Sequence, residues 1–237
     1  MFHRLLLVLS VLPFQLSAQT PYFQQEVRYT IRATLNDRDH TLDAHIRMEY
    51  TNHSPDSLPE IRMHLWANAY KNKQTAFCRQ KLRDGNSRFY FAPEEESGYF
   101  KNIDFTVNGQ KTVWQVDKKN PDIAVLLLAQ PLPPGGKITI ETPFFLKIPA
   151  SFSRLGHVGT SYQITQWYPK PAVYDHLGWH DMPYLDIGEF YAEFGAFDVT
   201  ITLPENYVVG ATGALQTPSE VAFLQQKEAE TRREIAR

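Results

Sequence analysis

A stretch of closely spaced aromatic residues, from Thr160 to Phe197, constrains this chain more than any other feature of its sequence. Ten of its thirty-eight residues are aromatic, about twice the 13% share of the whole chain. Prolines and glycines interrupt the stretch, so no regular helix can run through it and bury these rings along one face. Long loops of this kind are usually functional or lie at an interface. We therefore expect an irregular segment that meets a ligand or another domain.

The first eighteen residues have the layout of a secretory signal peptide. A short basic start precedes an apolar run that ends near Ala18, at an approximate small-residue cleavage site. The run is interrupted by Pro13 and is shorter than the roughly 20 residues of a membrane-spanning helix. We expect removal of residues 1–18 and export to the periplasm or the extracellular space, with no membrane span in the mature protein.

Charge and cysteine content narrow the classes of partner. The chain has 24 basic and 26 acidic residues, a formal charge of −2, and no long run of one sign. This balance does not favour binding to nucleic acid or to an anionic membrane. Cys78 is the single cysteine of the sequence, so an exported chain has no internal disulfide and depends on apolar packing.

Alternating apolar and polar residues predict strands along most of the chain. The alternation is clear in residues 29–35 and stronger in residues 42–50, which predicts a long antiparallel hairpin. Asn108-Gly109 is a strong hairpin-turn signal between two further strands. The other expected strands are 60–66, 103–107, 111–116, 123–128, 137–146, 197–203 and 207–211. About nine strands favour an all-β fold, an antiparallel β-sandwich or saddle-shaped sheet assembly with a C-terminal helix.

Two segments depart from the strand pattern. Residues 68–97 are polar without a sustained period, which is consistent with a short helix or an irregular insertion. The layout of Thr217 to Glu220 is that of a capping box and predicts a helix, whose body contains no stop signal. We expect the chain to be truncated inside this element. The predicted organisation is a signal peptide (1–18), a β-rich domain (19–213) and a linker helix (214–237).

Local motifs for catalysis are absent. The eight histidines include no His-Glu-x-x-His arrangement, and the nearest approach, His176 with His180, has Trp179 where a glutamate would be needed. Gly178 argues against the helix that would align these two rings. Glu189 and Glu193 could be paired carboxylates, but solvated charges on a strand are the simpler interpretation. The Gly-x-Ser-x-Gly motif of a serine nucleophile is also absent.

Several segments together resemble the amino-terminal domain of the zinc-dependent aminopeptidase N family of metallopeptidases, the gluzincins, in its secreted bacterial form. The likeness covers nearly all of the mature chain. The segments that carry it are 29–35, 40–46, 50–58, 63–70, 165–175, 188–191, 197–199 and 208–213.

The resemblance implies a β-saddle domain at residues 19–213 and a missing thermolysin-like catalytic domain, which in the family holds zinc. It implies that this chain binds no cofactor and is inactive alone, so its own enzymatic status stays open. In the family, a Thr-Gln-x-Glu segment lines the peptide cleft, and Thr165, Gln166 and Trp167 match its first three positions. Tyr168 stands where the family has the glutamate that holds the peptide amino terminus.

Two hypotheses follow. In the first, the chain is the non-catalytic domain of a secreted zinc metallopeptidase, an aminopeptidase hydrolase, and Gln166, Trp167 and Tyr168 contact the peptide substrate. In the second, it is a secreted β-sandwich binding module for a glycan or peptide. The rings of Trp167, Tyr168, Trp179 and Tyr184 would then form an aromatic platform.

Overall fold

The computed structural model describes residues 22–236 of the chain. The signal peptide predicted for residues 1–18 lies outside the described residues. The chain divides into two units, one that ends at Leu203 and one that begins at Pro204. No helix in residues 22–236 is long and apolar enough to cross a membrane.

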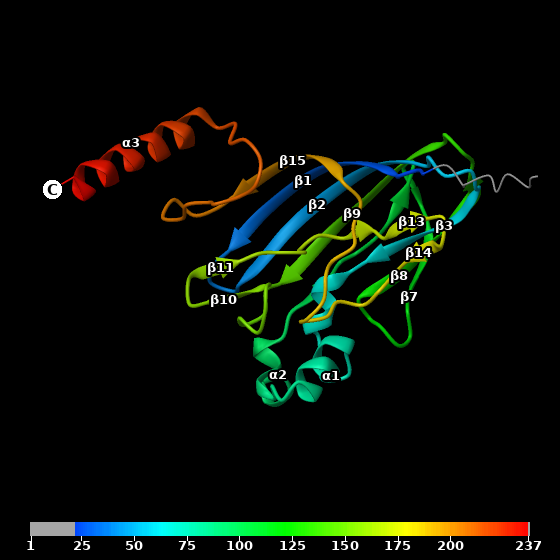
Figure 1. Ribbon diagram of the computed structural model, residues 1–237, viewed down its shortest axis with the longest axis horizontal. Helices are drawn as coiled ribbons and strands as arrows, with labels where there is room; N and C mark the ends of the chain where they lie inside the picture. Colours follow the sequence, from blue (N-terminus) through cyan, green and yellow to red (C-terminus); the bar gives the residue numbers. More distant parts are fainter. Residues whose placement is uncertain (1–21, 237) are drawn as a thin grey trace, which may run out of the picture. The chain divides into compact units, whose positions relative to one another are not determined.

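The first unit is built on a large, mainly antiparallel sheet with the strand order β15-β1-β2-β9-β5-β6, in which β4 also pairs with β9. Its strands are β1 (Glu26–Asn36), β2 (Thr41–Thr51), β4 (Tyr99–Lys101), β5 (Thr106–Val107), β6 (Gln110–Lys111), β9 (Lys137–Lys147) and β15 (Gly195–Thr202). Figure 1 shows β1, β2 and β9 side by side as the long strands of this sheet.

The predicted hairpin of β1 and β2 is confirmed. The two strands pair from Glu26 with Thr51 to Asn36 with Thr41. Alternate residues of β1 are buried, as the period of two requires. At the turn, Oδ1 of Asn36 accepts hydrogen bonds from the backbone N–H groups of Arg38 and Asp39, at 3.0 and 3.1 Å. The apolar face of this hairpin contributes much of the core.

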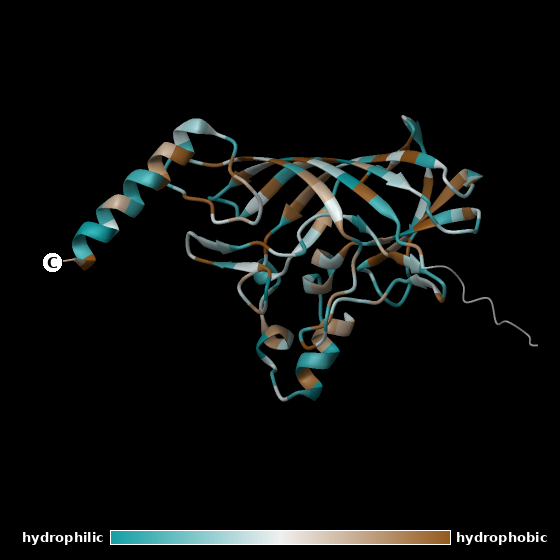
Figure 2. Ribbon diagram, turned by 45° about the horizontal axis from the view of Figure 1, so that its top comes forward, coloured by the Kyte–Doolittle hydropathy of each residue, from teal (hydrophilic) through white to brown (hydrophobic). Residues whose placement is uncertain are grey.

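A second, four-stranded sheet has the order β12-β3-β8-β7. It consists of β3 (Leu58–His64), β7 (Val113–Val116), β8 (Ile123–Leu132) and β12 (Lys170–Pro171). In Figure 2 the large sheet lies on one side of the unit, with the small sheet and the helical insertion on the other. Ile61 and Leu126 from the small sheet and Ile46 and Ile140 from the large sheet are all fully buried. The mostly-β, mostly antiparallel fold class is thus as predicted.

Residues 66–96 form a helical insertion between β3 and β4. It contains η1 (Trp66–Tyr70), α1 (Ala76–Arg83), α2 (Arg88–Phe91) and η2 (Glu94–Glu96). Thr75 caps α1, because its Oγ1 accepts from the backbone N–H of Cys78 at 3.2 Å. The insertion is therefore helical rather than irregular.

The aromatic stretch contains no helix, as expected, but it contributes short strands. Its strand β11 (Ser161–Gln163) pairs with β10 (Gly156–Val158), which precedes the stretch, and β13 (Val173–Asp175) forms a second hairpin with β14 (Gly178–His180). Tyr184 lies between β14 and β15. Its buried ring contacts the rings of Tyr70, Phe77 and Phe190. Much of this segment is therefore anchored to the core.

Three local predictions are wrong. Residues 207–211 form no strand, and Val208 and Val209 are 59% and 41% exposed, because an apolar run becomes a strand only beside a partner edge. Residues 113–116 form β7 and pair with β8, so the hairpin around Asn108-Gly109 is limited to β5 and β6. In the second unit α3 (Pro218–Ile235) begins where predicted, but Thr217 makes no side-chain capping bond.

The strand β15 also departs from a purely antiparallel arrangement. It pairs with β1 in parallel, from Val27 opposite Gly195 to Thr34 opposite Thr202. A parallel neighbour needs a long crossover connection, which the intervening chain supplies. Local alternation predicted the strand but carries no information about its direction.

Candidate functional site

The segment predicted to bind substrate, Gln166 to Tyr168, leads directly into β12. Gln166 has a φ of +53°, in the left-handed region that non-glycine residues seldom occupy. Such strain is retained where the surrounding structure enforces it, and it is frequent at binding sites. The strand β12 then pairs with β3, which sets Lys170 opposite His64 and Pro171 opposite Met63.

Lys170 connects this segment to the core. Its side chain is only 5% exposed, and its Nζ lies 4.2 Å from the ring centroid of Trp66. The ammonium group donates a hydrogen bond to Oε1 of Gln166. Burial lowers the pKa of Lys170 to about 8, so the group still carries a positive charge at neutral pH.

His64 lies in the same cluster. Its ring stacks on that of Trp66 with the centroids 4.2 Å apart, and it is fully buried. Neither ring nitrogen makes a well-formed hydrogen bond within residues 22–236, and the backbone of His180 is the group that acts to raise the pKa of the ring. Burial and, secondarily, the charge of Lys170 lower the pKa of His64 to about 3. The ring is therefore neutral, and Lys170 supplies the charge of the cluster.

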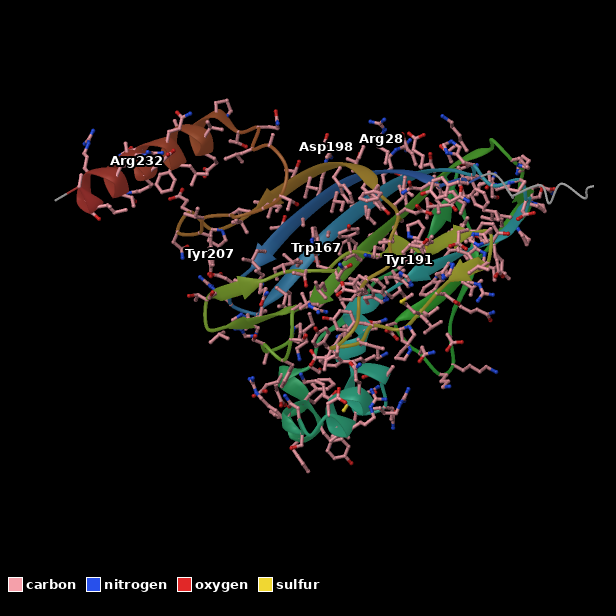
Figure 3. All side chains as sticks on the ribbon, viewed as in Figure 1. Arg28, Trp167, Tyr191, Asp198, Tyr207 and Arg232 are labelled. Carbon is pink, nitrogen blue, oxygen red and sulfur yellow. The ribbon has the colours of Figure 1, made fainter. Side chains whose placement is uncertain are left out.

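Trp167 and Tyr168 face the large sheet rather than the Gln166 amide. Trp167, labelled in Figure 3, lies against that sheet, with its ring centroid 6.2 Å from that of Phe144. The Tyr168 ring lies 5.6 Å from Tyr29 and 5.9 Å from Phe197. Burial raises the pKa of Tyr168 to about 12. Its neutral hydroxyl is no electrostatic equivalent of the glutamate that the resembled family has at this position.

A second cation, Arg154, borders the segment. Its backbone carbonyl accepts a 2.7 Å hydrogen bond from Oγ1 of Thr165, and its guanidinium lies 5.0 Å from the ring centroid of Phe190. The rings of Phe190 and Trp66 are 4.9 Å apart. The Nη1 atom of Arg154 is buried without a hydrogen-bond partner in the described chain. The Lys170 ammonium group and the Arg154 guanidinium thus lie against two neighbouring rings, those of Trp66 and Phe190.

The two histidines considered as a metal site both lie in the β13–β14 hairpin, with His176 in its turn and His180 at the end of β14. Nε2 of His180 lies 2.8 Å from Oδ1 of Asp175. Burial acts to raise the pKa of Asp175, but the interaction with His180 and hydrogen bonds from the Leu177 backbone and from Tyr191 together lower it. No group of three or more histidine, cysteine, aspartate or glutamate side chains suited to a metal is found among residues 22–236.

Neither Glu189 nor Glu193 lies on a strand, because both precede β15. Glu189 is exposed and borders a small cavity of about 70 Å³ beside Trp66 and Phe190. Burial raises the pKa of Glu193, against the opposing effect of hydrogen bonds from Gln24 and Gln25. Glu193 is therefore partly buried, whereas the sequence suggested a solvated charge.

A larger groove, of about 720 Å³, lies elsewhere, along the helical insertion and β4. Its basic lining residues are Lys71, Lys73 and Lys101, all exposed. Sequence reasoning identified neither this groove nor the cluster around Lys170. The one available signal for the cluster was a lysine held between Pro169 and Pro171 within an aromatic stretch.

Comparisons with known proteins give matches in structure alone. No family model matches the chain, and no curated protein matches it in sequence. Matching crystal structures include an M1 zinc metallopeptidase mutant from Deinococcus radiodurans and a two-domain M1 zinc metallopeptidase mutant bound to L-arginine, each 14% identical with a TM-score of 0.46. A third, from Deinococcus radiodurans, is bound to a Tyr-Ser-Ala substrate and is 13% identical with a TM-score of 0.46.

These matches cover 82% of this chain and 36% of the matched chains, so the chain corresponds to about a third of their length. All three are M1 zinc metallopeptidases, the class that the sequence resemblance names.

Proposed function

We propose that this chain is the non-catalytic amino-terminal domain of an exported zinc aminopeptidase and forms one wall of its peptide-binding cleft. A thermolysin-like catalytic domain is the proposed partner and holds the zinc ion. This chain itself is proposed to bind no metal. Gln166 is the proposed contact to the peptide, and Trp167 and Tyr168 form the support behind it.

The amide of Gln166 is the observation that carries the proposal. Its nitrogen makes no hydrogen bond within residues 22–236, and it is not among the buried unpartnered atoms of the described chain. A polar group that is held by a strained backbone, bonded through its oxygen and unbonded at its nitrogen is suited to bind a ligand. It lies within the Thr-Gln-x segment on which the family resemblance rests.

The aromatic-platform hypothesis is not supported by the burial of its rings. Tyr184 is 1% exposed and belongs to the core, while Trp167 and Tyr168 pack against the large sheet. A glycan platform needs ring faces open to solvent. The rings proposed for it therefore do not form one exposed surface.

Peptide binding to the 237-residue chain tests the proposal. In a two-dimensional NMR titration with tri-alanine, we expect the resonances of residues 165–170 to shift together. Shifts confined to the groove lined by Lys71, Lys73 and Lys101 would place binding elsewhere and contradict the proposal.

A kinetic test requires the chain together with its catalytic domain. Gln166→Ala is expected to lower kcat/KM by about tenfold to a hundredfold, the effect of one or two lost polar contacts. Because the same change removes the acceptor of buried Lys170, the free energy of unfolding must be measured in parallel. A loss of activity that only follows unfolding would make Gln166 a structural residue.

A further inference from the structure

Lys170 is a buried cation without a carboxylate partner. None of the ion pairs among residues 22–236 includes it, although its side chain is only 5% exposed. Its two partners are the neutral oxygen of Gln166 and the face of the Trp66 ring. Buried charges in proteins are nearly always paired, so this arrangement needs an explanation.

The contact with Lys170 decides which way the Gln166 amide points. An ammonium group has three donors and no acceptor, so the amide atom that faces it must be Oε1. The Nε2 group, with its two hydrogens, then points away from Lys170. It makes no hydrogen bond within the described chain, it is not among that part's completely buried unpartnered atoms, and Gln166 as a whole is half-buried. Gln166 therefore offers a ligand two donors and no free acceptor on this side.

We propose that Lys170 holds the Gln166 amide with Nε2 towards the ligand, and that the group recognised there is a carboxylate of the peptide, not its amino-terminal ammonium group. This inference rests on the proposed function and names the substrate chemistry of the same site. An N–H donor binds an oxygen acceptor, whereas an ammonium group needs an acceptor in the protein. Lys170 is thus a positioning residue, and Gln166 is the contact.

The charges around the amide favour an anion over a neutral carbonyl. Lys170 and Arg154 both stand on the Trp66–Phe190 ring pair, and His64 is neutral. Of the nearby carboxylates, Asp186 pairs with Lys81 at 2.9 Å and also interacts with the charge of Arg154, and Glu189 is exposed to solvent. Lys170 is therefore the cation of this cluster that no carboxylate balances, and hydrogen bonds between charged partners are the stronger ones.

Matched ligands distinguish the two ends of a peptide. The probes are tri-alanine with both ends free, its N-acetylated form, its C-terminal amide, a tripeptide amide with one glutamate side chain, and N-acetylglycine as a carboxylate without a peptide chain. Dissociation constants of the 237-residue chain are measured by NMR from residues 165–170. We expect acetylation to have little effect and amidation to weaken binding by about tenfold or more. The glutamate peptide shows whether a side-chain carboxylate serves as well as the terminal one.

Variants test the role of each residue. Gln166→Glu keeps an oxygen towards Lys170 but replaces the outward donors by an acceptor, so we expect it to lose the carboxylate preference and to gain preference for a free amino terminus. Lys170→Met should abolish the preference, and Lys170→Arg should restore most of it. Lys73→Met, which removes an exposed lysine over Tyr90, is the matched control and should retain it.

Each outcome decides between the two proposals. If amidation has no effect and acetylation weakens binding, or if Gln166→Glu keeps the preference for carboxylates, the inference is wrong while the peptide-binding function stands. Binding of N-acetylglycine without binding of any tripeptide would support the inference and contradict the proposed function. Failure of all five probes to bind would overturn both.

Discussion

The side-chain hydroxyl groups of Tyr70 and Tyr184 are 2.8 Å apart, and Tyr70 donates the hydrogen bond. Both side chains are 1% exposed. Tyr70 ends η1 in the helical insertion, while Tyr184 belongs to the aromatic stretch more than one hundred residues later. This bond therefore ties the segment that carries the candidate site to the core.

Removal of this bond should destabilise the fold. Tyr184→Phe leaves the buried donor of Tyr70 without this acceptor, which costs about 1–2 kcal/mol of the free energy of unfolding. Urea unfolding measures the effect, and Tyr22→Phe is the control because Tyr22 is 88% exposed. The double variant with Tyr70→Phe should lose less than the sum of the two single variants. Strict additivity would mean that the hydroxyl groups contribute independently.

The sequence predicts those parts of the fold that depend on neighbours along the chain. The alternation in residues 29–50 is sufficient for β1 and β2 because their register follows from a short turn. The parallel pairing of β15 with β1 joins Val27 to Gly195, and no local pattern encodes such a distant contact.

The candidate site likewise has one part that the local sequence predicts and another that depends on distant contacts. Gln166 was identified through its sequence context, which is local. Its orientation depends on Lys170, and the burial of Lys170 depends on Trp66 from another part of the chain. These tertiary contacts place a positive charge beside the Gln166 amide. Sequence spacing alone could not predict this.

Asp122 should make the protein less stable as the pH rises from 4 to 7. Burial raises the pKa of its carboxyl from 3.8 to about 6, and Oδ2 accepts a 2.6 Å hydrogen bond from the backbone N–H of Tyr184. Because the folded state holds this proton more tightly than the unfolded state, the contribution of Asp122 to stability is fully present below about pH 4 and is lost as the pH rises through 6. The loss from this group is about 2–3 kcal/mol.

Asp122→Asn isolates this effect, because an asparagine can accept the same hydrogen bond and does not titrate. The free energy of unfolding of the variant relative to the parent should rise by about 2–3 kcal/mol between pH 4 and pH 7. Asp43→Asn, at an exposed position of β2, is the control. A difference that stays constant with pH would show that Asp122 titrates normally.

The apolar residues of β15 should make the isolated chain bind apolar dyes. Phe197, Val199 and Ile201 are 50%, 42% and 39% exposed, on the strand that pairs with the buried Tyr29 and Ile31 of β1. Val199→Thr with Ile201→Thr keeps β-branched side chains, so the strand should persist while dye fluorescence and self-association fall. Thr200→Ser on the same strand is the control. A parent chain that is monomeric and binds no dye would contradict this expectation.

The stacking contact between the rings of His40 and His157 should weaken as the pH falls. The ring centroids are 3.6 Å apart, and Nδ1 of His40 lies 2.7 Å from the hydroxyl of Tyr162, so the β10–β11 hairpin is held against the β1–β2 turn. Burial and then the charge of His157 lower the pKa of His40 below 6.5, although Asp37 and Asp39 act in the opposite direction. Because the folded state favours the neutral ring, the stabilisation is complete above about pH 7 and is lost as the pH falls through 6.5 towards the folded pKa.

An NMR titration of the ring protons should give a pKa for His40 below that of a free histidine. In His157→Gln we expect this pKa to rise towards 6.5 without reaching it, since burial remains. His53→Gln, whose ring contacts the carbonyl of Gln24 instead, should leave His40 unchanged. If His40 titrates at 6.5 or above in the parent protein, the two rings do not repel each other in solution, and the hairpin is not sensitive to acid through this pair.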